Sequence, residues 1–342
     1  MPKNEQVILA ERPTGMPDET HLVLQEGAMP EAAEGEVVLK TLYLSLDPYM
    51  RGRMNNAASY AKPVELGQVM EGATVSEVME SRYEGLAPGD IVLGYCGWQR
   101  YASAPGKALR KLDPAQAPIT TALGVMGMPG FTAYVGLLDL GQPRVGETVV
   151  VSAAAGAVGQ VVGQLARIRG CRVVGVAGAD DKCRRVTETY GFDACINHKA
   201  DDFEQQLDAA CPDGIDVYFE NVGGRVFDAV MKRVNDFARI PVCGRIAHYN
   251  QTELPEERDR LIPFMGKVLV KRLMLRGFIQ SDHLERQHDF LNDMGEWLRQ
   301  GQVHYQEDIV EGLENAVSAF QGLLRGDNRG KLMVRVAPDP TH

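Results

Sequence analysis

Two hydrophobic patterns divide the chain near residue 120. Before that point, short apolar stretches alternate closely with glycine and proline, and residues 36–43, 72–78 and 90–94 are predicted to form strands. The dipeptide Pro88-Gly89, just before the last of these stretches, is typical of a turn. Short strands separated by frequent turns predict a small antiparallel barrel in this part of the chain.

From residue 130 onward, helical and buried-strand patterns alternate. We predict strands at 148–152, 172–176, 194–196, 215–220, 238–242 and 273–278, and helices at 181–190, 202–211, 224–234 and 285–300. A further helix follows the first of these strands, because apolar residues recur there at helical spacing. These residues are Val158, Val161, Val162, Leu165 and Ile168. The alternation predicts an α/β fold with a doubly wound parallel sheet. Residues 301–342 return to strand, helix and strand, and we expect them to pack on the first domain.

The turn after the first of these strands has the features of a dinucleotide site. Small residues fill it from Ser152 to Gly159, and in the pattern G-x-G-x-x-G, Ala154 replaces the first glycine while Gly156 and Gly159 keep the other two places. Small side chains let backbone amides approach a pyrophosphate, and the dipole of the following helix attracts the negative charge. An ordinary strand–helix turn is the alternative, but the surrounding βαβ pattern favours the nucleotide site.

The next strand indicates which nicotinamide cofactor is bound. NAD-specific sites usually end this strand in Asp or Glu, whereas here it ends in Ala177-Gly178. Lys182 follows at the start of a helix, where an ammonium group would pair with a ribose 2′-phosphate. Asp180 and Asp181 are expected to cap this helix. The pattern favours NADPH, and a solvated lysine is the alternative interpretation of Lys182.

Composition and charge exclude several classes of protein. The chain has 342 residues, is 44% hydrophobic and carries a formal net charge of −10 with no basic run. Nucleic-acid binding is therefore not expected, because phosphate contacts need clustered Lys and Arg. The polar N-terminus and the lack of a long apolar run predict no signal sequence and no membrane span. Six cysteines without a CxxC pair fit a reducing, cytoplasmic setting.

A catalytic zinc ion is not expected either. Zinc alcohol dehydrogenases share this two-part layout, and their metal needs three Cys, His or carboxylate ligands. The corresponding segment here, residues 67–72, has Gln68 and Met70, and Cys96 is the only cysteine in the first domain. We therefore predict no metal, and carbonyl chemistry would need another source of oxyanion stabilisation.

Five motifs, in order along the chain, resemble those of a known family. They are LSLDPYMRGRM at 44–54, GMPGFTAY at 127–134, AGAVG at 155–159, ENVGG at 220–224 and GDNRGK at 326–331. The chain resembles the zinc-independent medium-chain reductases of the leukotriene B4 12-hydroxydehydrogenase/prostaglandin reductase family. The resemblance implies a GroES-like β-barrel catalytic domain at 1–122 and 301–342, and a Rossmann domain at 123–300. It also implies NADPH as cofactor, a homodimer, and reduction of the C=C bond of α,β-unsaturated ketones and aldehydes.

The resemblance further implies which residues line the cofactor. They are Met128 and Thr132 beside the nicotinamide; Phe278 and Ile279 near the carboxamide; Gly156, Ala157, Val158 and Gly159 at the pyrophosphate; Gly178, Lys182 and His198 at the 2′-phosphate end; Asn221 on the adenosine and ribose side; and Asn328 from the tail. His198 stands where many relatives have Tyr. A histidine there could donate to a phosphate with a charge that depends on pH, and a surface histidine is the alternative.

In the expected reaction, hydride adds to the β-carbon of an enone and negative charge develops on the carbonyl oxygen. By the resemblance Tyr249 faces that oxygen, and a phenol with a pKa near ~10 would act as a donor. Tyr49 is a second candidate for the substrate pocket, and a packing role is the alternative for both. His248 stands where relatives commonly have a small hydroxyl residue. Rival functions are a zinc-independent NADPH quinone reductase and a non-catalytic NADPH-binding protein.

Overall fold

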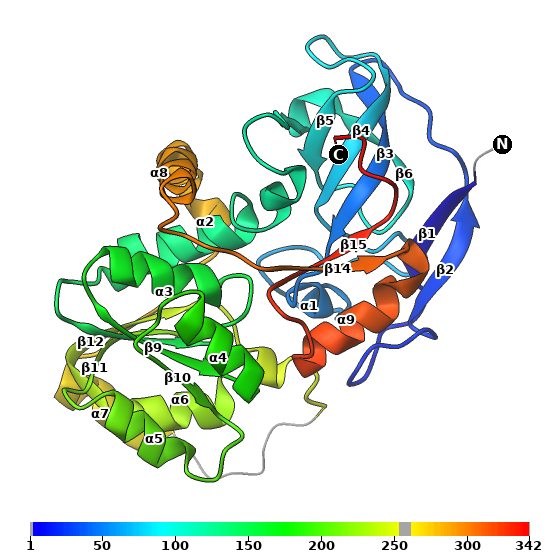
Figure 1. The fold of residues 1–342 in the computed structure, drawn as a ribbon. Coiled ribbons are helices and arrows are strands. Elements are labelled where there is room, and N and C mark those ends of the chain that lie inside the picture. The colour runs from blue at the N-terminus through cyan, green and yellow to red at the C-terminus, as the bar shows by residue number, and fades with distance from the viewer. Residues whose placement is uncertain (1–2, 253–260, 342) are drawn as a thin grey trace. The chain divides into compact units, whose positions relative to one another are not determined.

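A computed structural model describes residues 3–252 and 261–341 of the chain (Figure 1). Its contacts divide the chain into two units. One unit joins Met1–Gly124 to Glu307–His342, and the other is Val125–Gln306. The first unit therefore contains both ends of the chain, and the second is one continuous segment.

The second unit is built on a six-stranded parallel sheet with the order β10-β9-β8-β11-β12-β13. Its strands are β8 (Thr148–Ser152), β9 (Arg172–Ala177), β10 (Ala194–Asn197), β11 (Ile215–Phe219), β12 (Val234–Val242) and β13 (Met274–Gly277). From β8 the chain runs outward to β9 and β10, and then returns to β11 on the other side of β8. The strand order thus reverses between β8 and β11, and ligands of open α/β sheets bind at the carboxyl ends beside such a point.

Helices cover both faces of this sheet. Successive side chains of a strand point to opposite faces, so each face of the sheet has its own hydrophobic core. Val149 and Val151 of β8 belong to one hydrophobic core, and Val150 belongs to another. The helices of this unit are α2 (Met128–Tyr134), α3 (Gly159–Ile168), α4 (Asp180–Glu188), α5 (Phe203–Ala210), α6 (Gly224–Met231), α7 (Leu261–Lys271) and α8 (Gln287–Arg299). The result is the doubly wound arrangement predicted from the alternating pattern.

The first unit contains a seven-stranded sheet, mainly antiparallel, and a separate hairpin-like pair, β1 (Asn4–Leu9) and β2 (Leu22–Gly27). The sheet has the order β14-β15-β3-β4-β5-β7, and β6 also pairs with β3. Its strands are β3 (Glu36–Ser45), β4 (Thr74–Ser81), β5 (Ile91–Gly94), β6 (Tyr101–Pro105), β7 (Arg110–Lys111), β14 (Glu307–Glu311) and β15 (Lys331–Arg335). The exception to the antiparallel pattern is the β14–β15 pair, which is parallel.

The C-terminal tail completes this sheet, since β15 pairs with β3 along Met333↔Ser45. Helix α9 (Ala316–Arg325) connects β14 to β15. The buried Lys331 ammonium donates to Asp47 Oδ1 at 2.8 Å and to the Leu46 carbonyl at 2.8 Å. A buried ion pair is tolerable when such hydrogen bonds satisfy it, and loss of one partner is costly. This pair fixes the segment that leads into Tyr49 and the short helix α1 (Met50–Arg53).

Several local expectations were wrong. The predicted helix 224–234 ends at Met231, and β12 begins at Val234 rather than at residue 238. Ile168, expected on the buried face of this helix, is 36% exposed and is the last residue of α3. Asp180 and Asp181 lie in the first turn of α4, whereas its N-cap is Ala179, with no side-chain capping bond. Asp180 instead accepts a hydrogen bond from Asn197 Nδ2 at 2.8 Å.

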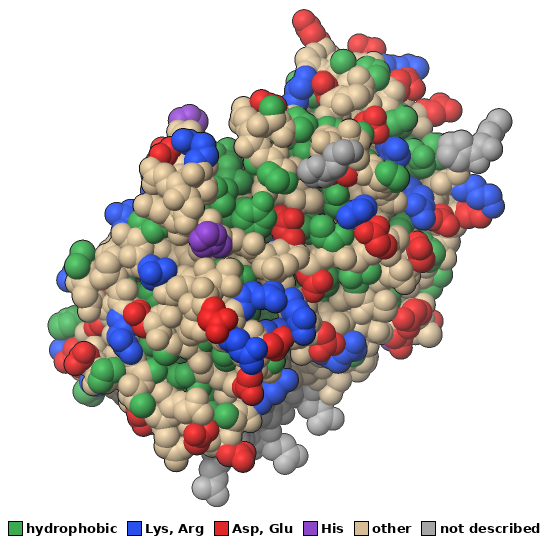
Figure 2. Space-filling model, in the orientation of Figure 1, with side chains coloured by type: hydrophobic (Ala, Val, Ile, Leu, Met, Phe, Trp, Pro, Cys, Tyr) green, Lys and Arg blue, Asp and Glu red, His purple; other side chains and the backbone are tan. Residues whose placement is uncertain are grey.

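On the face shown in Figure 2, acidic and basic side chains lie interspersed, without a broad field of one sign. None of the helices among the described residues is long and apolar enough to cross a membrane.

Candidate active site

The nucleotide turn lies where the strand order reverses. It leaves β8 after Ser152, and Ala153 takes a left-handed conformation with φ of 50°. The Gly156 amide then donates to the Ala153 carbonyl at 2.8 Å, and α3 begins at Gly159. The turn therefore directs the N-terminus of a ten-residue helix toward the carboxyl edge of the sheet.

Two close approaches explain the glycines of this turn. A Cβ atom on Gly159 would lie 2.3 Å from the Ala153 carbonyl oxygen, and one on Gly156 would lie 3.1 Å from the same oxygen. Only glycine fits at position 159, whereas even a small side chain at position 156 would be tight. Because this turn lacks bulky side chains at the N-terminus of α3, its backbone amides are open to a bulky anion. The residues present therefore fit a pyrophosphate.

A buried carboxylate fixes the opposite side of the same edge. Glu220, just after β11, is 2% exposed, and its Oε1 accepts from the amides of Val222 and Gly223. Its Oε2 accepts from the Tyr218 hydroxyl at 3.0 Å. Burial raises the pKa of Glu220, and the hydrogen bonds from Val222 and Gly223 oppose that rise. The carboxylate therefore shapes the loop that leads from β11 into α6.

Ser152 connects the two sides. Its hydroxyl lies 3.1 Å from Glu220 Oε1 and accepts from the Asn221 amide at 2.8 Å. The Asn221 side chain in turn donates to the Ser152 carbonyl at 2.8 Å. The ends of β8 and β11 are thus joined by side-chain hydrogen bonds as well as by the sheet. The sequence motif indicated Asn221, but it gave no role to Ser152 or Glu220.

The predicted 2′-phosphate end lies at the tip of β9. A Cβ atom on Gly178 would lie 3.2 Å from His198 Nε2 and 3.8 Å from Lys199 Cε. Lys182 lies in the first turn of α4, directly after that tip. Sequence reasoning missed two further cations in this region, Lys199 and Arg225. Adjacent basic residues after β10 were the available signal for Lys199, whereas nothing in the sequence pointed to Arg225.

The loop that carries Tyr249 lies beside Asn221. The Ile246 amide donates to the Asn221 carbonyl at 3.2 Å, and the Ala247 amide donates to the Val222 carbonyl at 3.0 Å. The Tyr249 hydroxyl lies 3.5 Å from the Arg245 amide, at the edge of hydrogen-bonding distance. This loop places the phenol on the same edge of the sheet as the nucleotide turn.

His248 packs against the turn that starts α6. Its Nδ1 lies 2.9 Å from Gln251 Oε1, and its ring leaves no room for a Cβ atom on Gly223, which would lie 2.7 Å from Nε2. Gly223 also has a φ of 80°, a conformation that side chains disfavour. His248 therefore packs against Gly223 within this loop region.

The residues expected at the nicotinamide lie on α2 and in the segment that follows β13. Met128 begins α2, and the Thr132 hydroxyl donates to the Met128 carbonyl at 2.7 Å, one helical turn back. Phe278 follows β13 and packs edge-on against Phe219, with ring centroids 6.2 Å apart. Ile279 precedes the helical turn at Gln280–Arg286. Since the Thr132 hydroxyl donates its proton to the Met128 carbonyl, its oxygen is left as an acceptor. The NH₂ group of a carboxamide is a donor of the matching kind.

Two predicted site residues belong to the first unit. Tyr49 is half-buried, and burial, followed by the charge of Asp47, raises the pKa of its phenol. The Arg53 guanidinium lies 5.6 Å from the Tyr49 ring centroid and donates to Glu71 at 2.7 Å. In the loop before β15, Asn328 donates to the Gly330 carbonyl at 2.7 Å.

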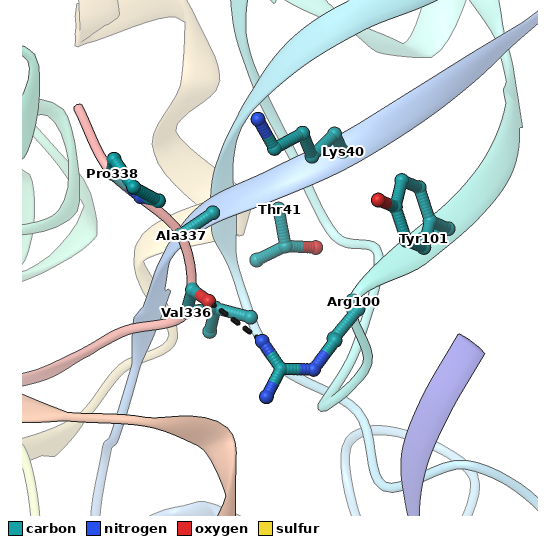
Figure 3. A pocket seen from close by; sticks show the side chains of 7 residues that line it. All are labelled: Lys40, Thr41, Arg100, Tyr101, Val336, Ala337 and Pro338. Carbon is teal, nitrogen blue, oxygen red and sulfur yellow. Dashed lines mark hydrogen bonds between the residues drawn. The ribbon is translucent and has the colours of Figure 1, made fainter. Parts of the chain in front are cut away.

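A cavity of 160 Å³ in the first unit contains none of the predicted residues (Figure 3). It lies between β3, β6 and the tail, and its cations are already engaged. Arg100 donates to the Val336 carbonyl at 3.0 Å and pairs with Glu5, and Lys40 lies 3.7 Å from Glu77. This cavity is therefore not the predicted active site.

Across the described parts of the chain, no three His, Cys, Asp or Glu side chains come together as a group that could ligate a metal ion. A nucleotide turn at a strand-order reversal in the second unit, together with a first unit built mainly of antiparallel strands, is typical of a medium-chain dehydrogenase/reductase. Two family models match: "N-terminal domain of oxidoreductase" over residues 5–112 and "Zinc-binding dehydrogenase" over residues 157–298.

The chain belongs to the zinc-independent leukotriene B4 12-hydroxydehydrogenase/prostaglandin reductase family of these enzymes. It is 54% identical over 339 residues to the NADPH-dependent curcumin reductase of Escherichia coli, covering 98% of each chain. It is 40% identical over 327 residues to rat prostaglandin reductase 1, covering 94% and 95% of the two chains. The crystal structure of CurA from Vibrio vulnificus in complex with NADPH superposes with a TM-score of 0.95 at 51% identity, covering 98% of this chain and 100% of that one.

Replacement of Glu220 tests its role beneath the loop. Glu220→Gln keeps the shape of the side chain but replaces one carboxylate oxygen, an acceptor, with an NH₂ group. That NH₂ group then faces the hydrogen-bond donors around it. We expect the free energy of unfolding to fall by about 1–3 kcal/mol, because a buried donor loses its partner. Chemical denaturation followed by fluorescence measures this loss, and Glu188→Gln on the exposed end of α4 is the matched control.

The pH dependence provides a second check. The pKa of Glu220 is higher in the folded protein than in the unfolded chain, so the folded state binds this proton more tightly. Stability from this group is therefore greatest at low pH and declines as pH rises from 4.5 through the raised pKa. The wild-type advantage over Glu220→Gln should shrink across that window. An advantage that grows with pH would contradict this account of Glu220.

Proposed function

We propose that this protein is an NADPH-dependent reductase of the C=C bond of α,β-unsaturated ketones and aldehydes. The nucleotide turn between β8 and α3, which has no room for a side chain at Gly159, is the observation that carries the proposal. The basic groups around Gly178 favour NADPH over NADH, and the similarity to curcumin and prostaglandin reductases supports the reaction class. When bound, NADPH supplies the hydride that adds to the β-carbon.

In this proposal, Gly156, Ala157, Val158 and Gly159 hold the pyrophosphate, while Lys182 and His198 face the 2′-phosphate beside Gly178. Asn221, whose side chain is fixed by Ser152, lies on the adenosine and ribose side. Met128, Thr132, Phe278 and Ile279 hold the nicotinamide and its carboxamide, and Asn328 contributes from the tail. Each assignment combines the family resemblance with a location on the described elements.

Tyr249 is the proposed donor to the substrate carbonyl. As hydride reaches the β-carbon, negative charge moves to the carbonyl oxygen, and a fixed hydroxyl donor lowers the energy of that state. The Ile246 and Ala247 hydrogen bonds fix the loop that carries Tyr249, so the donor needs little reorganisation during the reaction. Tyr49, with its raised pKa, would serve as a neutral wall or donor of the substrate pocket.

A panel of acceptors tests the reaction class. NADPH oxidation would be followed with a diaryl enone such as curcumin, a short 2-alkenal and a quinone, and the products identified by mass and NMR. We expect a saturated C=C bond with the carbonyl intact. An allylic alcohol would indicate carbonyl reduction, turnover of the quinone alone would indicate a quinone reductase, and no turnover with tight NADPH binding would indicate a non-catalytic protein.

The variant Tyr249→Phe tests the donor. We expect kcat/KM for the preferred enone to fall about 100-fold, because one donor to a developing oxyanion is lost. The Kd for NADPH should not change, and Tyr83→Phe in the first unit should behave as wild type. Wild-type turnover in Tyr249→Phe would remove Tyr249 from this role.

We further propose that the protein is a homodimer and that α7 and β13 form its interface. Phe264 and Val268 of α7 pack toward the core, yet the helix has no fully buried residue. Five of its other positions are large, apolar and exposed, which is unusual for a surface helix. They are Leu261 at 60%, Ile262 at 74%, Met265 at 53%, Leu269 at 76% and Val270 at 67%.

The neighbouring strand supports the same interface. β13 lies at the edge of the six-stranded sheet beside β12, and an exposed strand edge favours pairing with another chain. A second copy would cover both features with one symmetric contact.

The cytoplasm is the proposed location, since all six cysteines are free thiols, as expected in a reducing compartment.

Light scattering coupled to size exclusion tests the dimer. We expect twice the chain mass for the wild type and a monomer for the double variant Ile262→Glu/Leu269→Glu, because two buried carboxylates would oppose association. Val145→Glu, at an apolar position that is 84% exposed outside this surface, is the matched control and should stay dimeric. A monomeric wild type, or a double variant that stays dimeric, would exclude this interface.

A further inference from the structure

A single arginine connects two elements next to the proposed 2′-phosphate site. Arg225, the second residue of α6, donates from one guanidinium nitrogen to the His198 carbonyl at 3.0 Å. Its other terminal nitrogen donates to the Ala200 carbonyl at 3.2 Å. The guanidinium also lies over the Phe203 ring, 5.4 Å from its centroid. Arg225 therefore fastens the turn that leads from β10 into α5.

This turn carries two basic side chains to the tip of β9. The His198 amide donates to the Ala177 carbonyl at 3.0 Å, which brings the imidazole over Gly178. The Lys199 amide donates to Asn197 Oδ1 at 3.0 Å, and the same Asn197 side chain donates to Asp180 on α4. Gly178 leaves the space that both side chains use, since a Cβ atom there would lie within 4 Å of each.

Charged groups surround the imidazole on every element packed near it. Lys199 follows it in the chain, Arg225 comes from α6, and the first turn of α4 contributes Asp180, Asp181 and Lys182. The acidic Asp201 and Asp202 lie before α5. Burial, followed by the charges of Lys199 and Arg225, lowers the pKa of His198. The imidazole is therefore neutral at pH 7.5 in the cofactor-free protein.

We propose that Arg225 is a positioning residue for NADPH specificity: it fixes the turn at residues 198–200 so that His198 and Lys199 both face the 2′-phosphate beside Gly178. The proposal rests on the NADPH site described above and extends it to a residue that does not touch the cofactor. Its two carbonyl contacts need the planar fork of a guanidinium, which a lysine does not reproduce. A charge-only role would tolerate lysine, so the two roles differ in a measurable way.

The same geometry predicts that His198 is protonated when NADPH binds. A phosphate dianion next to a neutral imidazole favours the imidazolium, so NADPH binding should be accompanied by proton uptake at His198. NADH lacks the phosphate and should bind without that uptake. At pH 7.5 the 2′-phosphate is itself a dianion, with a second pKa near about 6, so its own titration contributes little.

Titration calorimetry with NADPH and NADH on the full-length protein tests the proposal. We expect Arg225→Lys and Arg225→Met to weaken NADPH about fivefold, because two hydrogen bonds that order the turn are lost, and to leave NADH unchanged. Lys182→Ala, which removes a proposed direct phosphate contact, should weaken NADPH about ten- to a hundredfold and also spare NADH. Thermal unfolding of each variant verifies that the fold is intact.

Proton uptake on NADPH binding distinguishes the two roles, because a purely structural role of Arg225 would leave it unchanged. The same titrations at pH 7.5, in buffers of different ionisation enthalpy, should show uptake with NADPH in the wild type and none in His198→Gln. Arg225→Lys should reduce the uptake, because its turn no longer keeps the imidazole next to the phosphate. The fragments 2′,5′-ADP and 5′-ADP should reproduce the NADPH and NADH results, which separates the phosphate from the nicotinamide.

Each outcome has one interpretation. If Arg225→Lys binds NADPH as the wild type does, or if both cofactors weaken equally, the positioning role is wrong. If Lys182→Ala weakens NADPH selectively while the Arg225 variants do not, only this inference fails and the NADPH site stands. If none of the variants discriminates between the cofactors, the location of the 2′-phosphate site itself is wrong.

Discussion

The cofactor site depends on the hydrogen-bonded connection between the carboxyl ends of β8 and β11. The strand order reverses there, so no crossover helix fills the space above the sheet, and the two loops that leave the strands must be fixed by other means. Ser152, Glu220 and Asn221 provide that connection. The buried Glu220 carboxylate is costly to desolvate, but it orders two loop amides and a tyrosine hydroxyl at once.

The loops fixed in this way divide the work of the proposed reaction. The turn from Ala153 to Gly159 is the proposed pyrophosphate site, because glycine removes side chains where the backbone is closest. The loop after Glu220 supports the segment that carries Tyr249, the proposed donor to the substrate carbonyl. The turn after β10, fastened by Arg225, carries basic groups to the proposed 2′-phosphate site. In this proposal, cofactor binding and catalysis therefore share the carboxyl edge of the sheet.

The sequence predicts the parts of this fold whose residues are adjacent in the chain. The bounds of β8 were correct, because an unbroken run of Thr and Val between turns suits a strand buried on both faces. β1 and β2 were missed, because their apolar stretches, at residues 7–9 and 22–24, are short and the rest of each strand is polar. The proposed roles of the turn glycines and Lys182 come from strand–turn–helix spacing, whereas the proposed role of Tyr249 comes from the family resemblance.

The remaining features depend on partners that are distant in sequence. Arg225 binds the carbonyls of residues 198 and 200, and a backbone carbonyl has no signature in the sequence. Ser152 and Glu220 are separated by 68 positions, and only the parallel pairing of β8 with β11 brings them together. The incorrect capping assignment at Asp180 has a similar cause, because Asn197 on another strand competes for the carboxylate.

The central claim is that hydride reaches the β-carbon of a conjugated carbonyl compound. It is tested most directly by turnover of an enone with NADPH deuterated at C4, using both C4 epimers in turn, followed by NMR of the product. The account predicts that one epimer delivers deuterium to the β-carbon of a saturated ketone or aldehyde. Deuterium on the carbinol carbon of an allylic alcohol would contradict it.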